Sequence, residues 1–349
     1  MEKYSSHDAT QPGADVSGSS DGSGPPVIVG GCPRSGTTLL RSMLNSHPHL
    51  AVPHETAFIV PLYRKRDSFG DLADPDNRRK VAEWIVKDKK SRNERLKATP
   101  EELVEAALQS PPTLGSILAA CFALNARNHG KPRWGDKRPS HAWNLNAIFD
   151  LFPDAQYVNV IRDPRACAAS MNRVGWSWGG VESATEMWQR AIVSAEAWRR
   201  KLPREQYLDV YYEELVRDPR TVLGRVCAFL GLDPAGIDSM LEYHQDPERP
   251  TGTPFKEISK PVTTESMHSW ESQLSGTDVA LIEEVVGEEM RRHGYEPTGT
   301  RVPVPKERMK AFRRIRSSRS KQVRKRQLVE VKRMVTYRRP SADQTRGGS

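Results

Sequence analysis

The sequence predicts an α/β fold in which a central, mainly parallel sheet is flanked by helices. Three observations predict it. The apolar run Val27–Val29 passes through a Gly-rich turn into a helical pattern that begins at Thr37. Two further buried strands, Tyr157–Ile161 and Tyr207–Tyr211, are also followed by helical patterns. Strands that alternate with helices are typical of a parallel sheet covered on both faces.

The composition divides the chain of 349 residues into three parts. Residues 1–26 are rich in Ser, Gly, Asp and Pro without an apolar period, so we expect them to be disordered. Residues 27–300 are expected to form the folded domain. Residues 301–349 carry 17 Lys and Arg against 3 Asp and Glu, a net charge of +14 that leaves −5 for the rest. We therefore expect a basic C-terminal tail that can form a helix.

Neither a membrane span nor a secretory leader is expected. No run of 18 apolar residues occurs, and Met1–Pro26 lacks an apolar stretch after its few charges. The four cysteines, Cys32, Cys121, Cys167 and Cys227, are scattered without metal-ligand spacing. We therefore expect reduced thiols in a cytoplasmic protein and no metal site.

The first strand-to-helix turn has the spacing of a phosphate-binding loop. Gly31–Thr38 reads G-x-x-x-x-G-T-T, with Thr37 where a nucleotide-triphosphate loop has its Lys. Backbone N–H groups and the helix dipole attract an anion to such a turn. Arg34 adds a cation whose planar fork can hold two oxygens of a phosphate or sulfate group. We therefore expect a P-loop-like anion site that is not built for ordinary metal-assisted ATP hydrolysis.

Glu55 follows the next short strand. Leu50–Val52 lies between Pro48 and Pro53 and is expected to pair beside the first strand. Because ligands bind beyond the carboxyl ends of parallel strands, Glu55 is expected to face whatever the loop holds. The residues leave one alternative open, in which Glu55 is an acidic residue at the start of a helix at Thr56–Tyr63.

Residues 64–130 are expected to form a helical insertion or lid over the sheet. Helical periodicity occurs at Lys80–Lys90, Pro100–Ser110 and Leu114–Asn128, and Thr99 is the expected cap of the second of these helices.

Trp134–Pro139 is expected to be a polar loop before a helix at Ser140–Phe149. Lys137 and Arg138 would supply cations to the bound anion, and a solvated loop is the alternative reading of both.

A second strand-to-helix turn also suits an anion. The strand Tyr157–Ile161 ends at Arg162, and Asp163 and Pro164 are typical of the cap and first position of the next helix. Ser170 lies two turns into that helix. Arg162 and Ser170 predict a second anion site, separate from the first. Two such sites suit a ligand with phosphates at both ends.

The remaining elements continue the alternation of strand and helix. Helices are expected at Ala184–Lys201, at Pro219–Leu230 with Gly231 as its terminal glycine, and at Asp278–His293. Val302–Pro305 is expected to be a stiff spacer before the tail.

The motifs together resemble those of sulfotransferases that use 3′-phosphoadenosine 5′-phosphosulfate (PAPS). The two most specific are PRSGTTLLRSML at 33–44 and IRDPRACAASM at 161–171. Four others extend the resemblance over 27–295: HET at 54–56, DKRP at 136–139, YYEELVRDPRTVLGRVCAFLGL at 211–232 and KPVTTESMHSW at 260–270. The chain looks most similar to the tyrosylprotein sulfotransferases and related bacterial enzymes.

This resemblance implies a cofactor site and a reaction. The 5′-phosphosulfate would be bound by Arg34, Ser35, Gly36, Thr37 and Thr38. Arg162 and Ser170 would hold the 3′-phosphate, and Tyr212 would lie near the adenine. The sulfuryl group would pass to an acceptor hydroxyl by in-line displacement, leaving 3′,5′-adenosine bisphosphate, and no metal would be needed.

The resemblance also implies catalytic roles. Glu55 would be the general base that takes the proton of the acceptor hydroxyl. Lys137 would stabilise the oxygen between phosphate and sulfate, and Arg34 would support the loop as a cation. One departure is present: Ser269, preceded by His268, stands where the tyrosylprotein enzymes have a Lys before the last Trp. The acceptor could be a carbohydrate, a phenol or a peptide.

Two other functions remain as alternatives. A nucleotide or small-molecule kinase would use the same loop, but the missing Lys at Thr37 argues against it. Residues 306–339 mix apolar residues with many Arg and Lys, which suits a basic helix on an anionic membrane surface as well as a solvated tail. Nucleic acid is the less favoured partner, because the tail offers few aromatic side chains for stacking.

Overall fold

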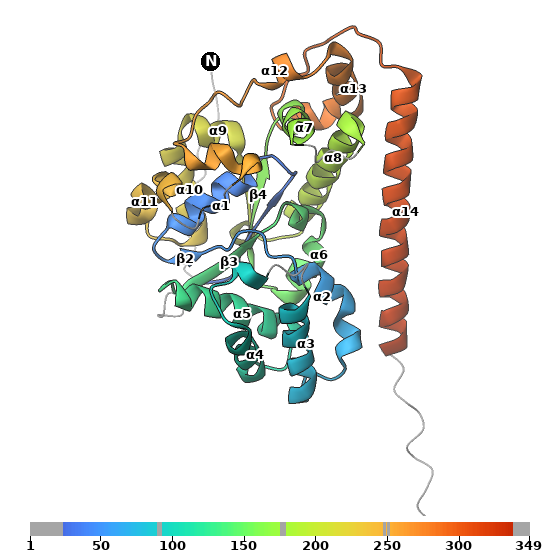
Figure 1. Ribbon diagram of the computed structural model, residues 1–349. Coiled ribbons are helices and arrows are strands. Elements are labelled where there is room, and N and C mark those ends of the chain that lie inside the picture. Colours follow the sequence, from blue (N-terminus) through green and yellow to red (C-terminus); the bar gives the residue numbers. More distant parts are fainter. Residues whose placement is uncertain (1–23, 89–92, 175–178, 247–248, 250–251, 338–349) are drawn as a thin grey trace, which may run out of the picture.

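The computed structural model describes residues 24–88, 93–174, 179–246, 249 and 252–337 (Figure 1). Residues 1–23, most of the segment predicted to be disordered, lie outside the described residues. The end of the predicted basic tail, residues 338–349, also lies outside them.

The sheet confirms the predicted α/β fold with a parallel centre. Within the described part of the chain it has five strands in the order β2-β3-β1-β4-β5, and every neighbouring pair runs parallel. The strands are β1 (Val27–Gly31), β2 (Leu50–Ala51), β3 (Arg133–Lys137), β4 (Gln156–Ile161) and β5 (Tyr207–Tyr211). The central strand is β1, so the loop that follows it emerges at the middle of the carboxyl edge.

Helices cover both faces of the sheet because β1 is apolar on both of its faces. Ile28 packs into one core and its neighbours Val27 and Val29 into the other. The first core is closed by α2 (Ile59–Lys65), α3 (Pro75–Lys87), α4 (Pro100–Gln109), α5 (Leu114–Asn128) and α6 (Leu145–Leu151). The second is closed by α1 (Thr37–Ser46), α9 (Tyr212–Arg217), α10 (Pro219–Leu230) and α11 (Ile237–Leu241).

A third core lies beside the carboxyl end of β4. Ile161 packs there with residues of three helices: α7 (Pro164–Arg173), α8 (Gly180–Arg199) and α13 (Gly276–Arg292). The short helix α12 (Trp270–Gln273) packs against α7. These helices place the segment that leads into α12 close to the ends of the strands.

The prediction of a loop at Trp134–Pro139 is wrong, because most of these residues belong to the strand β3. This strand lies between β1 and β2, so the expected pairing of Leu50–Val52 with the first strand is also wrong. The charges of β3 are tolerated inside because they have partners. Asp136 accepts hydrogen bonds from Thr56 Oγ1 at 2.9 Å and lies 2.8 Å from His141 Nε2.

Three predicted helix boundaries agree with the structure. Thr99 caps α4 in a reciprocal capping box with Glu102, Asp163 caps α7, and Gly231 ends α10 in a left-handed conformation. The first predicted insertion helix begins earlier, at Pro75. The helix predicted at Ser140–Phe149 is divided into the 3-10 turn η3 (Pro139–Trp143) and α6.

The basic C-terminal segment begins as a long helix, α14 (Lys306–Tyr337), that runs beside α8 (Figure 1). Phe312 is buried, and Met309 packs against the third core. Arg308 donates hydrogen bonds to Glu182 at 2.6 Å and to Asp278 at 2.7 Å. The start of α14 is therefore attached to the domain. None of the described helices combines the length and apolar character needed to cross a membrane.

Candidate active site

The loop after β1 presents the start of α1 to the carboxyl edge of the sheet. Gly36 has φ +102°, and a Cβ atom there would lie 2.5 Å from the Tyr212 ring. Only glycine fits both conditions, so the chain passes directly against that ring. Arg34 also has a positive φ, +67°, which is uncommon for a residue with a side chain. This strained turn directs the first N–H groups of α1 into the cavity.

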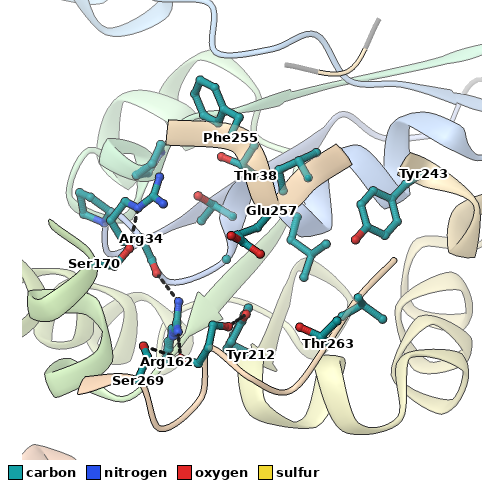
Figure 2. Close-up of a pocket in the computed structure, with 18 of the residues that line it drawn as sticks. Arg34, Thr38, Arg162, Ser170, Tyr212, Tyr243, Phe255, Glu257, Thr263 and Ser269 are labelled. Carbon is teal, nitrogen blue, oxygen red and sulfur yellow. Dashed lines mark hydrogen bonds between the residues drawn. The ribbon is translucent and has the colours of Figure 1, made fainter. Parts of the chain in front are cut away.

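The two predicted anion sites join in one network. Arg34 Nε donates to Ser170 Oγ at 3.0 Å, and Arg162 Nη1 donates to the Arg34 carbonyl at 3.2 Å. Figure 2 shows Arg34 directed toward Ser170, with Arg162 on the other side of the loop. The two predicted sites are therefore direct neighbours. A ligand with two anionic groups can contact both sites within one cavity.

Tyr212 and Ser266 fix the position of Arg162. The Arg162 guanidinium lies over the Tyr212 ring, 4.1 Å from its centre, and Arg162 Nη2 donates to the Ser266 carbonyl at 2.5 Å. Tyr212 Oη lies 2.5 Å from Ser266 Oγ. Stacking and hydrogen bonds together leave the guanidinium little freedom to rotate, which prepares it to bind an oxyanion.

Glu55 lies where the carboxyl ends of β1 and β3 meet. Lys137 Nζ, at the end of β3, donates to Glu55 Oε1 at 2.6 Å and to Thr38 Oγ1 at 3.1 Å. Lys137 is fully buried, and burial lowers the pKa of its ammonium, while the neighbouring Glu55 carboxylate opposes that shift. The Lys137 ammonium therefore links the Glu55 carboxylate to Thr38, at the start of α1, which faces the anion site.

The backbone around Glu55 is held by buried polar side chains. Asn45 Oδ1 accepts from Val52 N at 2.9 Å, and Arg41 Nε donates to the Val52 carbonyl at 2.6 Å. Arg95 Nη1 donates to the His54 carbonyl at 2.6 Å. Glu55 itself has φ +48°, so these bonds maintain a conformation that the residue seldom adopts alone. The reading of Glu55 as the first acidic residue of a helix is wrong, because α2 begins only at Ile59.

His54, beside Glu55, stays neutral in this environment. Burial, together with the Lys137 ammonium, lowers the pKa of His54 to about 3. Its ring packs edge-on against Phe255, with 5.0 Å between the ring centres. The side chain therefore adds no positive charge near Glu55 at neutral pH.

The cavity gathers most of the predicted residues and suits an anionic ligand. The predicted residues that line it are Arg34, Gly36, Thr37, Thr38, Glu55, Arg162, Ser170 and Tyr212. Ser35 and Lys137 lie fully buried beneath them. Among the described residues, Ser35 Oγ and Arg162 Nε are buried polar atoms without a hydrogen-bond partner. Arg162 lines the cavity, so an oxyanion bound there can offer its guanidinium an acceptor, and an unsatisfied buried polar group otherwise costs about 1–3 kcal/mol.

Sequence reasoning missed several residues that line the same cavity. They are Arg173, Tyr243, Phe255, Thr263 and Ser266 (Figure 2 labels three of them). Ser266 lies within the motif at 260–270, but no spacing rule singles it out from the residues around it. Ser269 lines the cavity, whereas the exposed His268 lies 3.1 Å from Glu271 Oε1 instead. Across the described part of the chain, no three His, Cys, Asp or Glu side chains gather as they would around a metal ion.

The comparisons with known proteins agree with this geometry. The model of the sulfotransferase family matches residues 25–235. The protein-tyrosine sulfotransferase of Drosophila melanogaster is 27% identical over 287 residues, which are 78% of this chain and 52% of that protein. The chain thus spans about half the length of that relative. The nodulation protein NoeE of Sinorhizobium fredii is 26% identical, over 76% of this chain and 65% of its own.

Two solved structures share the fold. The sulfotransferase domain of the Synechococcus PCC 7002 olefin synthase has a TM-score of 0.51 at 24% identity, covering 76% of this chain and 95% of its own. The sulfotransferase domain from the curacin biosynthetic pathway has a TM-score of 0.52 at 20% identity, covering 78% and 98%. Both likenesses extend over nearly the whole of the solved domains.

Proposed function

The chain belongs to the sulfotransferase family, and we propose that it transfers the sulfuryl group of PAPS to the hydroxyl of an acceptor. One observation carries the proposal. Glu55 lines the same cavity as the anion site formed by Arg34, Arg162 and Ser170. Lys137, buried behind Glu55, joins it to Thr38 at the start of α1.

The residues of the cavity suit the two ends of PAPS. The loop residues Arg34 to Thr38 would hold the 5′-phosphosulfate with backbone N–H groups and side chains. Arg162 and Ser170 would hold the 3′-phosphate, since both adjoin the loop from α7 and the end of β4. The Tyr212 ring, packed against Gly36, would contact the adenine. When bound, PAPS supplies the sulfuryl group, and 3′,5′-adenosine bisphosphate remains.

Glu55 is the residue that we assign as general base. Its carboxylate lies at the cavity surface and can accept the proton of an acceptor hydroxyl while the acceptor oxygen bonds to sulfur. The bond from sulfur to the phosphate oxygen breaks in the same step. Lys137 and the first N–H groups of α1 stabilise the charge that develops on that oxygen, and one well-placed donor contributes about 3 kcal/mol. Arg34 adds a guanidinium on the other side of the loop.

The acceptor is proposed only as a class. Two curated relatives are named as protein-tyrosine sulfotransferases, so a tyrosine hydroxyl is one candidate beside carbohydrates and small phenols. Residues 56–130, the 175–180 loop and residues 240–270 are the expected sources of acceptor contacts, and Phe255 and Thr263 of the last range line the cavity.

The experiment is a screen with radiolabelled PAPS. The full chain is incubated with tyrosine peptides, phenols and oligosaccharides, and the Glu55→Gln variant is run in parallel. We expect label in one class with the native protein and a large loss of it with the variant. Transfer from labelled ATP, with none from PAPS, would contradict the proposal.

A second candidate concerns α14, and the exposure of its basic face favours it. Arg313, Arg314 and Lys321 are exposed, while Phe312 turns toward the domain. We propose that this face lets a cytoplasmic protein contact an anionic membrane surface by electrostatic attraction. Removing residues 306–349 should abolish binding to phosphatidylserine vesicles; unchanged binding would contradict this role.

A further inference from the structure

A second cavity, with a volume of about 280 Å³, lies between α2, η3, α8 and α14. Four arginines line it, one from each side: Arg64, Arg138, Arg190 and Arg319. We refer to it as the arginine cavity. A water molecule occupies about 30 Å³, so the space is large enough for a tetrahedral anion with part of the molecule that carries it.

The described residues that line the arginine cavity include only cations among their charged groups, and Glu186, outside the lining, pairs with Arg319 and acts on Arg190. Arg138, Arg190 and Arg319 are partly buried. Like charges that meet in a partly buried space repel one another more strongly than they do in water. An anion at the centre offsets this repulsion, and arginine is the side chain best suited to hold sulfate or phosphate oxygens in pairs.

The guanidinium groups are oriented by neighbours. Arg190 lies over the Trp143 ring, 4.6 Å from its centre. Arg64 Nη2 donates to Asn144 Oδ1 at 3.2 Å. Trp143 and Asn144 also line the cavity, so its walls hold two of its own cations in place.

Arg319 is positioned by the docking of α14. Its guanidinium pairs with the buried Glu186, and Arg319 Nη2 donates to Ser183 Oγ at 3.1 Å. Neither Glu186 nor Ser183 lines the cavity. The anchoring of Phe312 and Arg308 against the domain brings this part of the helix to the cavity wall. The cavity is thus completed by the segment that the sequence indicated as a tail.

From this arrangement we propose that the arginine cavity binds an oxyanion of the sulfate or phosphate type. It is distinct from the PAPS site. Pro139 lines the catalytic cavity, whereas its neighbours Arg138 and Ser140 line the arginine cavity. The two sites therefore lie on either side of the turn that follows Lys137, and the oxyanion is held next to the catalytic residues.

The proposal is tested by isothermal titration of the full chain with inorganic phosphate and with glycerol phosphate at constant ionic strength. We expect, for each, a saturable site in addition to binding at the anion site of the catalytic cavity. Arg64→Ala and Arg319→Gln should each weaken binding at this additional site by about tenfold or more, as the loss of a charged hydrogen bond does. The first of these variants alters an exposed side chain, so it tests the site even if Arg319→Gln fails to fold.

Two control variants make the result specific. Arg314→Ala changes an exposed arginine of α14 outside the cavity, and Arg162→Ala changes the catalytic cavity. Neither should weaken binding at the arginine cavity, although Arg162→Ala should weaken binding in the catalytic cavity. Equal losses in Arg314→Ala would assign the binding to diffuse surface charge, and a loss confined to Arg162→Ala would assign it to the catalytic cavity. Either result overturns the proposal, as does the absence of saturable binding.

Vesicles containing phosphatidic acid show whether a lipid is the source of the oxyanion. Vesicle binding that Arg64→Ala removes along with phosphate binding would support the proposal and identify a lipid headgroup as one ligand. Phosphate binding without vesicle binding would support a soluble ligand. Vesicle binding with no binding of either soluble phosphate would contradict an enclosed site.

Discussion

Lys137 Nζ lies 2.6 Å from Glu55 Oε1, although the Lys137 side chain has no solvent exposure and that of Glu55 retains 20%. The pair therefore connects the buried end of β3 with the open cavity. Lys137 also donates a hydrogen bond to Thr38. The same ammonium group therefore contacts both Glu55, the candidate base, and the start of α1, which faces the sulfuryl donor.

Replacement of Glu55 should remove the base and leave the donor site intact. We expect Glu55→Gln to lower kcat by roughly 10²- to 10⁴-fold, the usual contribution of a general base. The Kd of 3′,5′-adenosine bisphosphate, measured by titration calorimetry, should stay nearly unchanged. Glu257→Gln is the matched control, because Glu257 also lines the cavity. Near-normal turnover in Glu55→Gln would move the base role to His54 or His141.

Of the groups of the donor, the 3′-phosphate is the one that Arg162 should bind. Loss of one hydrogen bond to a charged group is worth about 1.5–3 kcal/mol, so Arg162→Ala should raise the Kd of the bisphosphate by roughly tenfold to a hundredfold. The Kd of adenosine 5′-phosphate, which has no 3′-phosphate, should change little. Equal weakening of both ligands in calorimetry would show that Arg162 contacts another part of the donor.

Arg95 is expected to be a positioning residue, because it bonds the carbonyl directly before Glu55. Arg95→Ala should lower kcat about tenfold, as the loss of one hydrogen bond of 1.5 kcal/mol implies. The Kd of the bisphosphate should not change. Arg127→Ala, an exposed arginine of the same helical layer, serves as control. If Arg95→Ala raised the Kd of the bisphosphate, with or without a fall in kcat, Arg95 would not act through Glu55 alone.

His54 should make the protein sensitive to acid. Its pKa is lowered from 6.5 to about 3 in the folded state, so between these values the unfolded chain binds the proton more readily. Stability should therefore fall as the pH decreases from 6.5 toward 3. In melting curves across this pH range, the Tm of His54→Gln should fall less than the Tm of the native protein. The Tm of His268→Gln, a change at an exposed position, should fall as much as that of the native protein. Parallel losses in all three proteins would contradict this assignment.

Motifs with a local physical cause were predictable from the sequence. The loop after β1, the strand β4 and the cap at Asp163 each depend on residues adjacent in the chain. Arg162 and Glu55 were found by the same logic, because the carboxyl ends of parallel strands share one edge.

The rest depends on partners that are distant in sequence. The charged Asp136 and Lys137 of β3 indicate a loop when only neighbouring residues are considered, because their partners Thr56 and Glu55 lie about 80 residues earlier. Ser266 contacts Arg162 through its backbone carbonyl, which no residue type reveals. The docking of α14 was also not apparent, since alternating Arg and apolar residues are compatible with both a packed and a solvated helix.

The central claim is that the cavity binds a nucleotide with phosphates at both ends, and ligand-dependent melting tests it most directly. A ligand that binds only the folded state raises Tm according to its concentration and Kd. We predict that 3′,5′-adenosine bisphosphate without metal stabilises the full chain more than ATP with magnesium does at equal concentration. Greater stabilisation by ATP with magnesium would contradict the sulfotransferase account and favour a kinase.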